Sequence, residues 1–227
     1  MHISYLAVSE KRCTIQMTNC NFKCRGCFSN KRHDHCIDIT PSRLAKHIPS
    51  DKEVMLAGGE PTIDKQGLLS LIHELDRQKL IISTNGYLLD ETLLQKLKGI
   101  TIHIDLKALN TKLHRWYTGK DNTRVLKAVQ LLYSNDFDFT VSTVYIPDVV
   151  DMEEIERIAR FLSGIGDIRY KIIRYIPVGG LSRRPHIREI ETSVKVAKKY
   201  LSNVSSSMEN RSHPKYRKIL DPLVLLE

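Results

Sequence analysis

The chain has 227 residues, of which 41% are hydrophobic and 27% are charged, a composition that suits a soluble domain with a substantial core. No run reaches the roughly 18 apolar residues of a transmembrane helix, and residues 1–4 lack the start of a signal peptide, so we exclude a membrane protein and expect a cytoplasmic one. The net charge of +9 is uneven, because residues 183–227 contain ten Lys or Arg and five Asp or Glu, an excess that favours an acidic partner.

The first predicted strand, residues 14–18, leads into a loop that contains Cys20, Cys24 and Cys27, separated by three and by two residues. Thiolates this close together suit a metal ion or an iron–sulfur cluster. All five cysteines lie within the first 36 residues, a poor arrangement for disulfides. Three thiolates on a four-iron cluster leave one iron without a protein ligand. An open coordination position of this kind is typical of catalytic metal sites.

Structural zinc is the other interpretation of the same cysteines. Cys36, His33 or His35 would then supply the fourth ligand, since thiolate and imidazole both suit zinc. Zinc knuckles usually pair two Cys-x2-Cys halves, and this chain offers only one such half, at residues 24–27. Unless they are ligands, we expect Cys13 and Cys36 to be small buried residues.

Apolar, β-rich runs alternate with amphipathic helical stretches after the cysteines. Helices are predicted over residues 41–47, 64–78, 90–98, 122–133 and 151–163. Strands are predicted over residues 54–57, 80–83, 100–106, 137–145 and 168–176. Together with residues 14–18 these make about six β/α units, which require a parallel sheet with right-handed crossovers.

Polar clusters follow the first four strands, at the end where parallel sheets and barrels bind their ligands. They are the cysteines, Gly58-Gly59-Glu60-Pro61, Thr84-Asn85-Gly86 and Asp105-Leu106-Lys107. Taken singly, the glycine-containing pairs read as tight turns, and the Asp and Lys as a buried ion pair. Glu60 is more specific, because Pro61 favours an extended backbone before it and directs the carboxylate off the strand end. Together the clusters predict one ligand site at one edge of the sheet.

The cysteine motif with the adjoining Phe28, followed on the next strand by Gly58-Gly59-Glu60-Pro61, resembles the radical S-adenosylmethionine (radical SAM) superfamily. The likeness runs from residue 14 to residue 176. It implies a partial (β/α)6 TIM-like barrel, the radical SAM core, over residues 1–180, with a basic helical extension over residues 181–227. No cysteine follows Cys36, so a single cluster is expected.

The resemblance implies a [4Fe-4S] cluster on Cys20, Cys24 and Cys27, with S-adenosylmethionine chelating the fourth iron through its methionyl amine and carboxylate. Phe28 would line the adenine pocket, and Glu60 with the glycine backbone would hold the methionyl ammonium. The residues that match S-adenosylmethionine contacts are Phe28, Gly58, Gly59, Glu60, Thr84, Asn85, Asp105 and Lys107.

Within the superfamily, parts of the chain resemble two kinds of glycyl-radical-enzyme activase. Asp105-Leu106-Lys107, with His114 and Gly119 after it, resembles the pyruvate formate-lyase activases, and residues 26–30 resemble the activase of anaerobic ribonucleotide reductase. These resemblances imply reductive cleavage of S-adenosylmethionine to a 5′-deoxyadenosyl radical, which abstracts hydrogen from a protein glycine under anaerobic conditions. A flavodoxin or a ferredoxin would supply the electron.

The basic C-terminal region leaves other substrates open. Its cations form either a solvated face or a docking surface for an acidic protein or nucleic acid. Radical SAM modification of RNA, a peptide or a small molecule is the alternative within this chemistry, although no platform of stacking aromatics is evident. A zinc-stabilised nucleic-acid-binding module is the alternative of another class. The basic residues concerned are Arg183, Arg184, Arg188, Lys195, Lys198, Lys199, Arg211, Lys215, Arg217 and Lys218.

Overall fold

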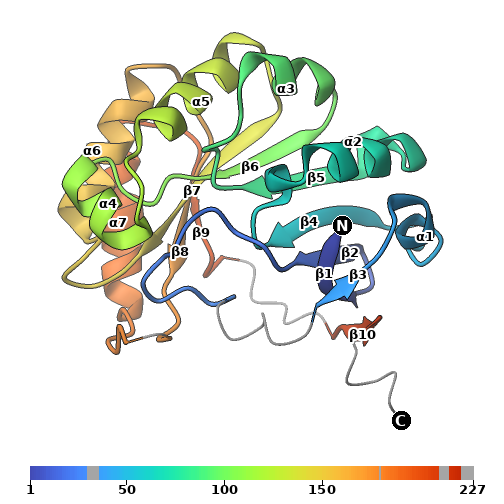
Figure 1. The fold of residues 1–227 in the computed structure, drawn as a ribbon. Helices are drawn as coiled ribbons and strands as arrows, with labels where there is room; N and C mark the ends of the chain where they lie inside the picture. Colours follow the sequence, from blue (N-terminus) through green and yellow to red (C-terminus); the bar gives the residue numbers. More distant parts are fainter. Residues whose placement is uncertain (30–35, 179, 210–214, 221–227) are drawn as a thin grey trace.

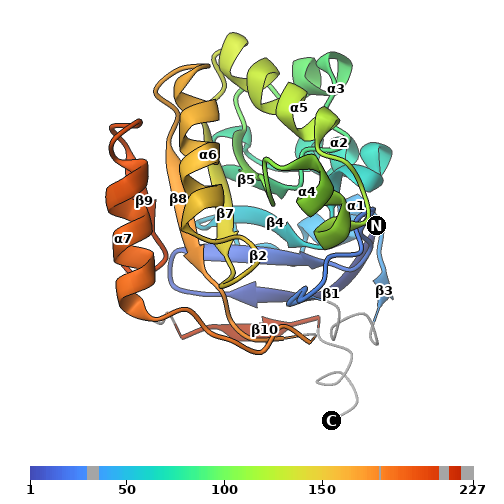
Figure 2. The ribbon, with the colours of Figure 1, turned by 90° about the vertical axis from the view of Figure 1, so that its left-hand side faces the viewer.

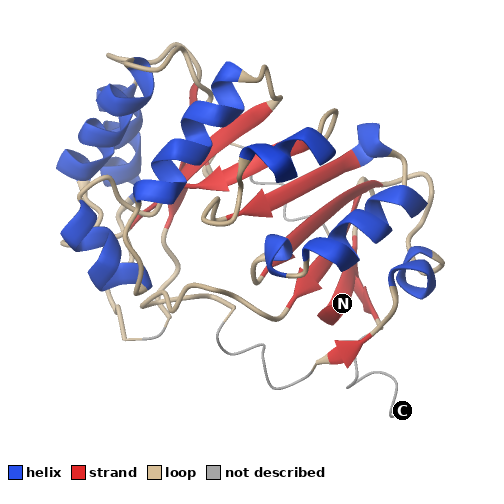
Figure 3. Cartoon of the chain, turned by 45° about the horizontal axis from the view of Figure 1, so that its top comes forward, coloured by secondary structure: helices blue, strands red, loops and turns tan. Residues whose placement is uncertain are grey.

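The computed structural model describes residues 1–29, 36–178, 180–209 and 215–220, which form an α/β fold. Figures 1 and 3 show one curved sheet with helices packed on its outer side. The sheet has ten strands: β1 (His2–Val8), β2 (Arg12–Met17), β3 (Ile37–Asp38), β4 (Glu53–Gly58), β5 (Leu80–Thr84), β6 (Thr101–Asp105), β7 (Phe139–Tyr145), β8 (Tyr170–Arg174), β9 (Val204–Ser206) and β10 (Arg217–Ile219).

The strand order is β10-β1-β2-β4-β5-β6-β7-β8-β9, and β3 pairs with β1. Neighbouring strands from β2 to β9 are parallel, whereas β1 is antiparallel to β2, β3 and β10. Within the described residues the two end strands, β9 and β10, do not pair with each other. The strands therefore form an open, partial barrel.

The described residues contain seven α-helices: α1 (Pro41–Ala45), α2 (Lys65–Glu74), α3 (Glu91–Lys96), α4 (Thr111–Thr118), α5 (Thr123–Ser134), α6 (Met152–Ser163) and α7 (Ile187–Ala197). Two 3-10 helices, η2 (Pro61–Ile63) and η3 (Arg77–Lys79), flank α2. Side chains of Thr40, Asp64, Asp90 and Asn110 accept backbone N–H groups at helix starts, as good N-caps do. None of the helices in this part of the chain has the length and apolar character needed to span a bilayer.

Strand β6 illustrates how the sheet separates apolar from polar side chains. Ile102 and Ile104 are fully buried in the core, while the intervening His103 and the last residue, Asp105, are only partly buried. Successive residues of a strand face opposite sides of the sheet. The helix-covered face is therefore apolar, and the inner face of the barrel is free to carry polar groups.

The predicted parallel sheet is confirmed, and β2, β4, β5, β6, β7 and β8 with the helices that follow them make the six expected units. Strands β1, β3, β9 and β10 are not among the predicted ones. In β1, residues 3–6 are all buried, so no alternation of polar and apolar residues marks it as a strand. The other three strands have two or three residues, too few to show a period.

The basic region after residue 180 contains α7, β9 and β10, where a helical extension is expected from the sequence. β9 continues the parallel sheet beside β8, and β10 pairs with β1 at the opposite edge (Figure 2). Arg211 and residues 221–227 lie outside the described residues. The described part of this region thus extends both edges of the sheet.

Candidate active site

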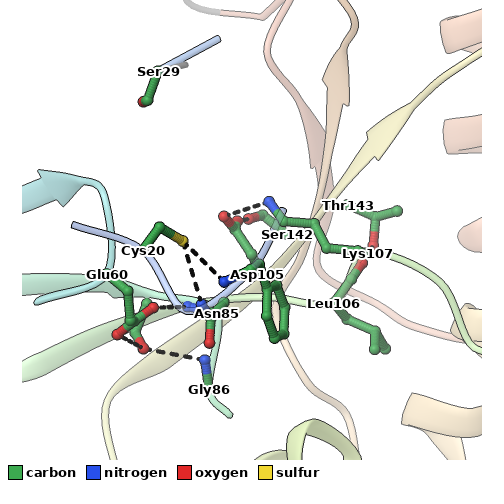
Figure 4. A network of polar contacts seen from close by, with 12 residues as sticks. Cys20, Ser29, Glu60, Asn85, Gly86, Asp105, Leu106, Lys107, Ser142 and Thr143 are labelled. Carbon is green, nitrogen blue, oxygen red and sulfur yellow. Dashed lines mark hydrogen bonds and ion pairs between the residues drawn. The ribbon is translucent and has the colours of Figure 1, made fainter. Parts of the chain in front are cut away.

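The cysteine loop, residues 18–29, leaves the carboxyl end of β2 and borders a cavity of about 250 Å3. All of the residues predicted to form the site line this cavity, although they come from four separate strand ends. They are Cys20, Cys24, Cys27, Phe28, Gly58, Gly59, Glu60, Thr84, Asn85, Asp105 and Lys107. Figure 4 labels Cys20, Glu60, Asn85, Asp105 and Lys107 among them. The expected convergence of the polar clusters at one edge of the sheet is therefore seen.

Helix α4 holds the cysteine loop from outside. The backbone N–H groups of Lys23 and Arg25 donate to the carbonyls of Thr118 and Tyr117, each over 2.8 Å. Phe22 is buried, and its ring packs edge-on against the rings of Tyr87 and His114, with a centroid distance of 5.6 Å to each. The loop between the cysteines is thus fixed by main-chain bonds and by one aromatic anchor.

Cys20 and Cys24 lie in surroundings that disfavour a bare thiolate, because desolvation raises the pKa of both thiols. Burial raises the pKa of Cys24 to about 12, although the nearby cation of Lys107 acts in the opposite direction. Cys20 Sγ lies 3.5 Å from the N–H of Phe22 and 4.0 Å from Nδ2 of Asn85, two donors that stabilise negative charge on sulfur. A bound metal deprotonates a coordinating thiol outright. The site therefore gains most from a cationic group that binds all three sulfurs.

Glu60 ties the ends of β4 and β5 together. Its carboxylate is buried and accepts three donors at Oε1: the N–H of Thr62 at 3.1 Å, the hydroxyl of Thr62 at 2.5 Å and the hydroxyl of Thr84 at 2.6 Å. Oε2 accepts the N–H of Asn85 at 2.6 Å and no other hydrogen bond from the described residues. A carboxylate offers about four acceptor sites, so Oε2 retains capacity for a cationic ligand in the cavity.

The two glycines before Glu60 let the turn after β4 lie close against the cysteine loop. Gly58 has φ +100°, and a Cβ atom on Gly59 would lie 2.2 Å from the carbonyl oxygen of Asn19 in the cysteine loop. The N–H of Glu60 donates to the same carbonyl over 2.6 Å, and Ser29 donates to the carbonyl of Gly58 over 3.2 Å. The β4 turn and the cysteine loop thus lie backbone against backbone, which only glycine permits at residue 59.

Asp105 and Lys107 form an ion pair on the third side of the cavity. Lys107 Nζ lies 2.8 Å from Asp105 Oδ2, and Ser142 on the neighbouring strand β7 donates to Asp105 Oδ1. Burial tends to lower the pKa of Lys107, but the charges of Asp105 and Cys24 outweigh it and hold that pKa above its usual value. The ammonium group stays charged, and Lys107 lines the cavity together with the three loop cysteines.

A second cavity of about 300 Å3 adjoins the first and shares Cys24, Cys27 and Lys107 with it. Its further walls are largely apolar and come from α4 and from the ends of β7 and β8. They include Tyr117, Val144, Ile173, Tyr175 and Ile176. The Tyr175 hydroxyl accepts the N–H of Val178 at 2.9 Å and lies 2.6 Å from the Val178 carbonyl, which closes the chain into a tight turn there.

Several contacts of the site are not predicted from the sequence. Thr62 supplies two donors to Glu60, Ser142 holds Asp105, and Asn21 Oδ1 accepts from Asn85 Nδ2 at 2.7 Å. Thr62 follows the glycine-glycine-glutamate-proline turn directly, and that adjacency is a signal that could have identified it. The Ser142 contact crosses between strands 37 residues apart, so it has no local signal.

The cysteines outside the loop differ from each other. Cys13 is fully buried in β2, as predicted, but Cys36 is exposed, so the expectation that it is a small buried residue is wrong. Cys36 follows β2 and the loop at a point where the chain returns to the sheet edge through β3. His33 and His35 lie outside the described residues. In the described ranges, no three His, Cys, Asp or Glu side chains are arranged around the position of a single metal ion.

Replacing Gly26 with alanine is expected to weaken the cysteine loop and the iron binding that the radical SAM resemblance implies for it. Gly26 has φ +70°, and a Cβ atom there would lie 2.7 Å from the Tyr175 hydroxyl. Gly99 is the matched control, because it has φ +82° and nothing within 4 Å of its Cβ position. We expect both variants to lose about 1 to 3 kcal/mol of unfolding free energy from the backbone conformation, and only Gly26→Ala to lose iron after reconstitution. Equal iron contents in the two variants would contradict this.

Comparisons with known proteins identify the family of this chain. The radical SAM superfamily model matches residues 14–162. A Methanocaldococcus jannaschii protein named “Putative glycyl-radical enzyme activating enzyme” is 36% identical over 97% of this chain and 89% of its own length. An isethionate sulfite-lyase activating enzyme of Oleidesulfovibrio alaskensis is 26% identical over 64% of this chain and 49% of its own.

Solved structures show the same fold. Streptococcus suis SuiB bound to S-adenosylmethionine superposes with a TM-score of 0.70 at 19% identity, over 84% of this chain and 48% of SuiB. A domain of a pyruvate-formate lyase-activating enzyme from Bacteroides vulgatus gives a TM-score of 0.60 at 18% identity, over 68% of this chain and 98% of that domain. With the family model covering most of the barrel, this chain belongs to the radical SAM superfamily and is an enzyme.

Proposed function

We propose that the chain binds a [4Fe-4S] cluster and S-adenosylmethionine and activates a glycyl-radical enzyme by taking a hydrogen atom from a protein glycine. The observation that carries this proposal is the shared cavity: three loop thiols, a carboxylate oxygen with a free acceptor site and a charged lysine all border it. Three thiolates suit three irons of a cubane cluster. A carboxylate and an ammonium suit the amine and carboxylate of an amino acid.

The residues of the chain fit this pair of cofactors. Cys20, Cys24 and Cys27 would hold the cluster, whose positive iron offsets the burial that disfavours a bare thiolate. Asn21 Nδ2 is buried beside them and has no hydrogen-bond partner among the described residues, which leaves a donor for a bound anion. When bound, the cluster and S-adenosylmethionine supply the electron and the 5′-deoxyadenosyl radical that abstracts hydrogen.

The residues on each side of the cavity would bind a different part of S-adenosylmethionine. Glu60 Oε2 and the backbone of Gly58 and Gly59 would hold the methionyl ammonium, while Lys107 would hold the carboxylate or ribose. Asp105 would position Lys107 and meet the same groups, with Thr84, Asn85 and Phe28 completing the contacts around them. Because these groups are fixed by bonds to neighbouring strands, they hold the ligand in one orientation against the cluster.

The adjoining apolar cavity suits the substrate. Its walls include Tyr117, Val144 and Ile173, and it opens directly onto the cysteines. Apolar walls exclude water and protect a reactive species from side reactions. A glycine in an extended protein loop presents a C–H bond without side-chain bulk, which suits such a narrow space. The M. jannaschii relative, with its activating-enzyme name and 36% identity, supports this choice of substrate.

Anaerobic reconstitution followed by electron paramagnetic resonance (EPR) tests the proposal. We expect about four iron and four sulfide per chain, formation of 5′-deoxyadenosine with dithionite, and a glycyl-radical doublet on a glycyl-radical enzyme from the same genome. Cleavage without any doublet on such a partner would contradict the activase and favour modification of RNA or another substrate. Colourless protein with one bound zinc would contradict radical chemistry altogether.

A further inference from the structure

The outer surface of α4 lies directly over the cysteine loop and is strongly basic. We call it the α4 basic face and define it by Lys23, Arg25, Lys112, Arg115, Trp116 and Lys120. Lys23 and Arg25 belong to the loop itself, and their main-chain bonds to Thr118 and Tyr117 join the loop to the last turn of α4. Figure 1 shows the loop running alongside this helix. The face is therefore the protein surface that directly covers the proposed cluster.

The charges of this face are almost entirely unbalanced. Its five cations are exposed, and among the described residues only Arg115 forms an ion pair, with Asp121 at 3.7 Å. The other four form no ion pair with any described residue. Some exposed cations elsewhere on the molecule are paired, as Arg160 is with Glu156, and others, such as Lys195, form no ion pair within the described part of the chain; what distinguishes this face is its position over the cysteine loop. Unpaired charge of one sign over one patch raises the potential there and attracts an acidic partner.

Trp116 gives the α4 basic face an apolar centre. Its side chain is 45% exposed, and the Arg25 guanidinium lies 4.8 Å from the centroid of its ring. Arg25 Nε also donates to the Trp116 carbonyl over 3.1 Å. Exposed Trp and Arg side chains held in place in this way are enriched at protein interfaces, where they anchor binding. Arg25 stands between Cys24 and Cys27, so this anchor touches the loop between two proposed cluster ligands.

The basic surface continues beyond α4 into a groove. Lys120 and Arg124 both lie over the ring of Tyr87, at 5.7 and 5.1 Å from its centroid. Tyr87 and Arg124 line an open groove of about 550 Å3 that also includes Lys127. The two acids of the groove are Asp90, which is paired with Lys65 at 3.1 Å, and Glu91; Arg124 and Lys127 supply cations that form no ion pair with the described residues. The groove offers room for an acidic loop next to the face.

We propose that the α4 basic face docks an acidic electron-donor protein, an inference that rests on the proposed function because it presupposes the cluster. Reduction transfers one electron from the reduced donor to the oxidised cluster and forms or breaks no bond. Electron-transfer partners form small, transient complexes that are guided by opposite charge. The face combines the required sign of charge with the position closest to the cysteine loop.

Helix α7 with the lysines that directly follow it, Lys198 and Lys199, is the natural comparison for this surface. It lies on the far side of α6 from α4 (Figure 2), away from the cysteine loop. Lys195 on α7 and Lys198 directly after it are exposed, as Lys112 and Arg115 are on α4. Replacing two of these cations with glutamate in each region changes the net charge of the protein equally. Any difference in donor binding between the two variants therefore reports the position of the charges.

The test compares Lys112→Glu/Arg115→Glu with Lys195→Glu/Lys198→Glu, using a purified acidic flavodoxin and a purified ferredoxin as probes. Binding to the holoenzyme is measured by isothermal titration calorimetry at low and at high salt. We expect the α4 variant to raise the Kd of its donor at least about tenfold and the α7 control to change it by no more than about twofold. Trp116→Ala, which changes no charge, is expected to weaken binding as well.

Activity with two reductants separates this inference from the proposed function. With dithionite, which needs no docking, the α4 variant should form 5′-deoxyadenosine at the wild-type rate, while its flavodoxin-driven or ferredoxin-driven rate falls. If the wild type fails with dithionite, the proposed function is wrong, and the calorimetry still decides the docking surface. The inference would be overturned if both double variants weakened donor binding equally or if the α4 variant did not weaken it. It would also be overturned if neither donor bound the wild type.

Discussion

Cys24→Ala protein should form no 5′-deoxyadenosine above the level without enzyme, whereas Cys36→Ala protein should remain fully active. Cys24 borders both cavities and is held in place by the loop that α4 anchors. With two thiolates left, a four-iron cluster lacks a third protein ligand and is lost or degraded. Cys36 is exposed and does not line either cavity. Iron content, the visible absorption spectrum and 5′-deoxyadenosine yield measure the difference.

The Cys36 variant is a control that also tests the zinc interpretation. If Cys36 supplied a fourth ligand to zinc, its removal would lower metal content about as much as removal of Cys24. Cys13→Ala is a second control, because this thiol is fully buried in β2 and its loss affects packing alone. Full activity of Cys24→Ala, or metal loss in Cys36→Ala alone, would contradict the assignment of the cluster to the loop.

Most of the barrel could be predicted because its strands and helices have strong periodic patterns. The helix starts at Asp64 and Asp90 each carry a capping side chain, and the strand at 100–106 alternates apolar and polar residues. The antiparallel β1 could not be recognised in this way, since its central residues are buried on both faces. The short strands β9 and β10 depend on long-range pairing, which leaves no local pattern.

The candidate site was predictable to the extent that its chemistry lies in short motifs. Glycine, glutamate and cysteine at strand ends identify the cavity walls, because parallel strands bring their carboxyl ends together. The supporting contacts were not predictable, since Ser142 reaches Asp105 from a different strand and the nearest α4 contact with the loop spans 91 residues. Such contacts depend on register, which a single sequence does not specify.

Replacing one partner of the Asp105–Lys107 ion pair is expected to lower the free energy of unfolding more than replacing both partners. Their side chains are 28% and 15% exposed and the pair is 2.8 Å apart, so either group left alone is a largely buried charge. We expect Lys107→Met and Asp105→Asn each to lower the free energy of unfolding by about 3 kcal/mol, and the double variant to lose less than either single variant. Urea unfolding of the four proteins under anaerobic conditions, without S-adenosylmethionine, measures this coupling.

Affinity for S-adenosylmethionine should follow a different order, because the ligand needs the charges themselves. All three variants should bind S-adenosylmethionine more weakly, and the double variant should not recover affinity even as it recovers stability.

The exposed pair Lys65–Asp90, 3.1 Å apart, is the control. Lys65→Met and Asp90→Asn should each change the free energy of unfolding by no more than about 1 kcal/mol and leave the affinity for S-adenosylmethionine unchanged. If the double variant at residues 105 and 107 regained both stability and affinity, the pair would be purely structural, and the proposed contact of Lys107 with S-adenosylmethionine would be wrong. If the double variant regains stability but not affinity, the ion pair serves to bind S-adenosylmethionine. Burying the two charges then costs desolvation energy that an apolar replacement avoids.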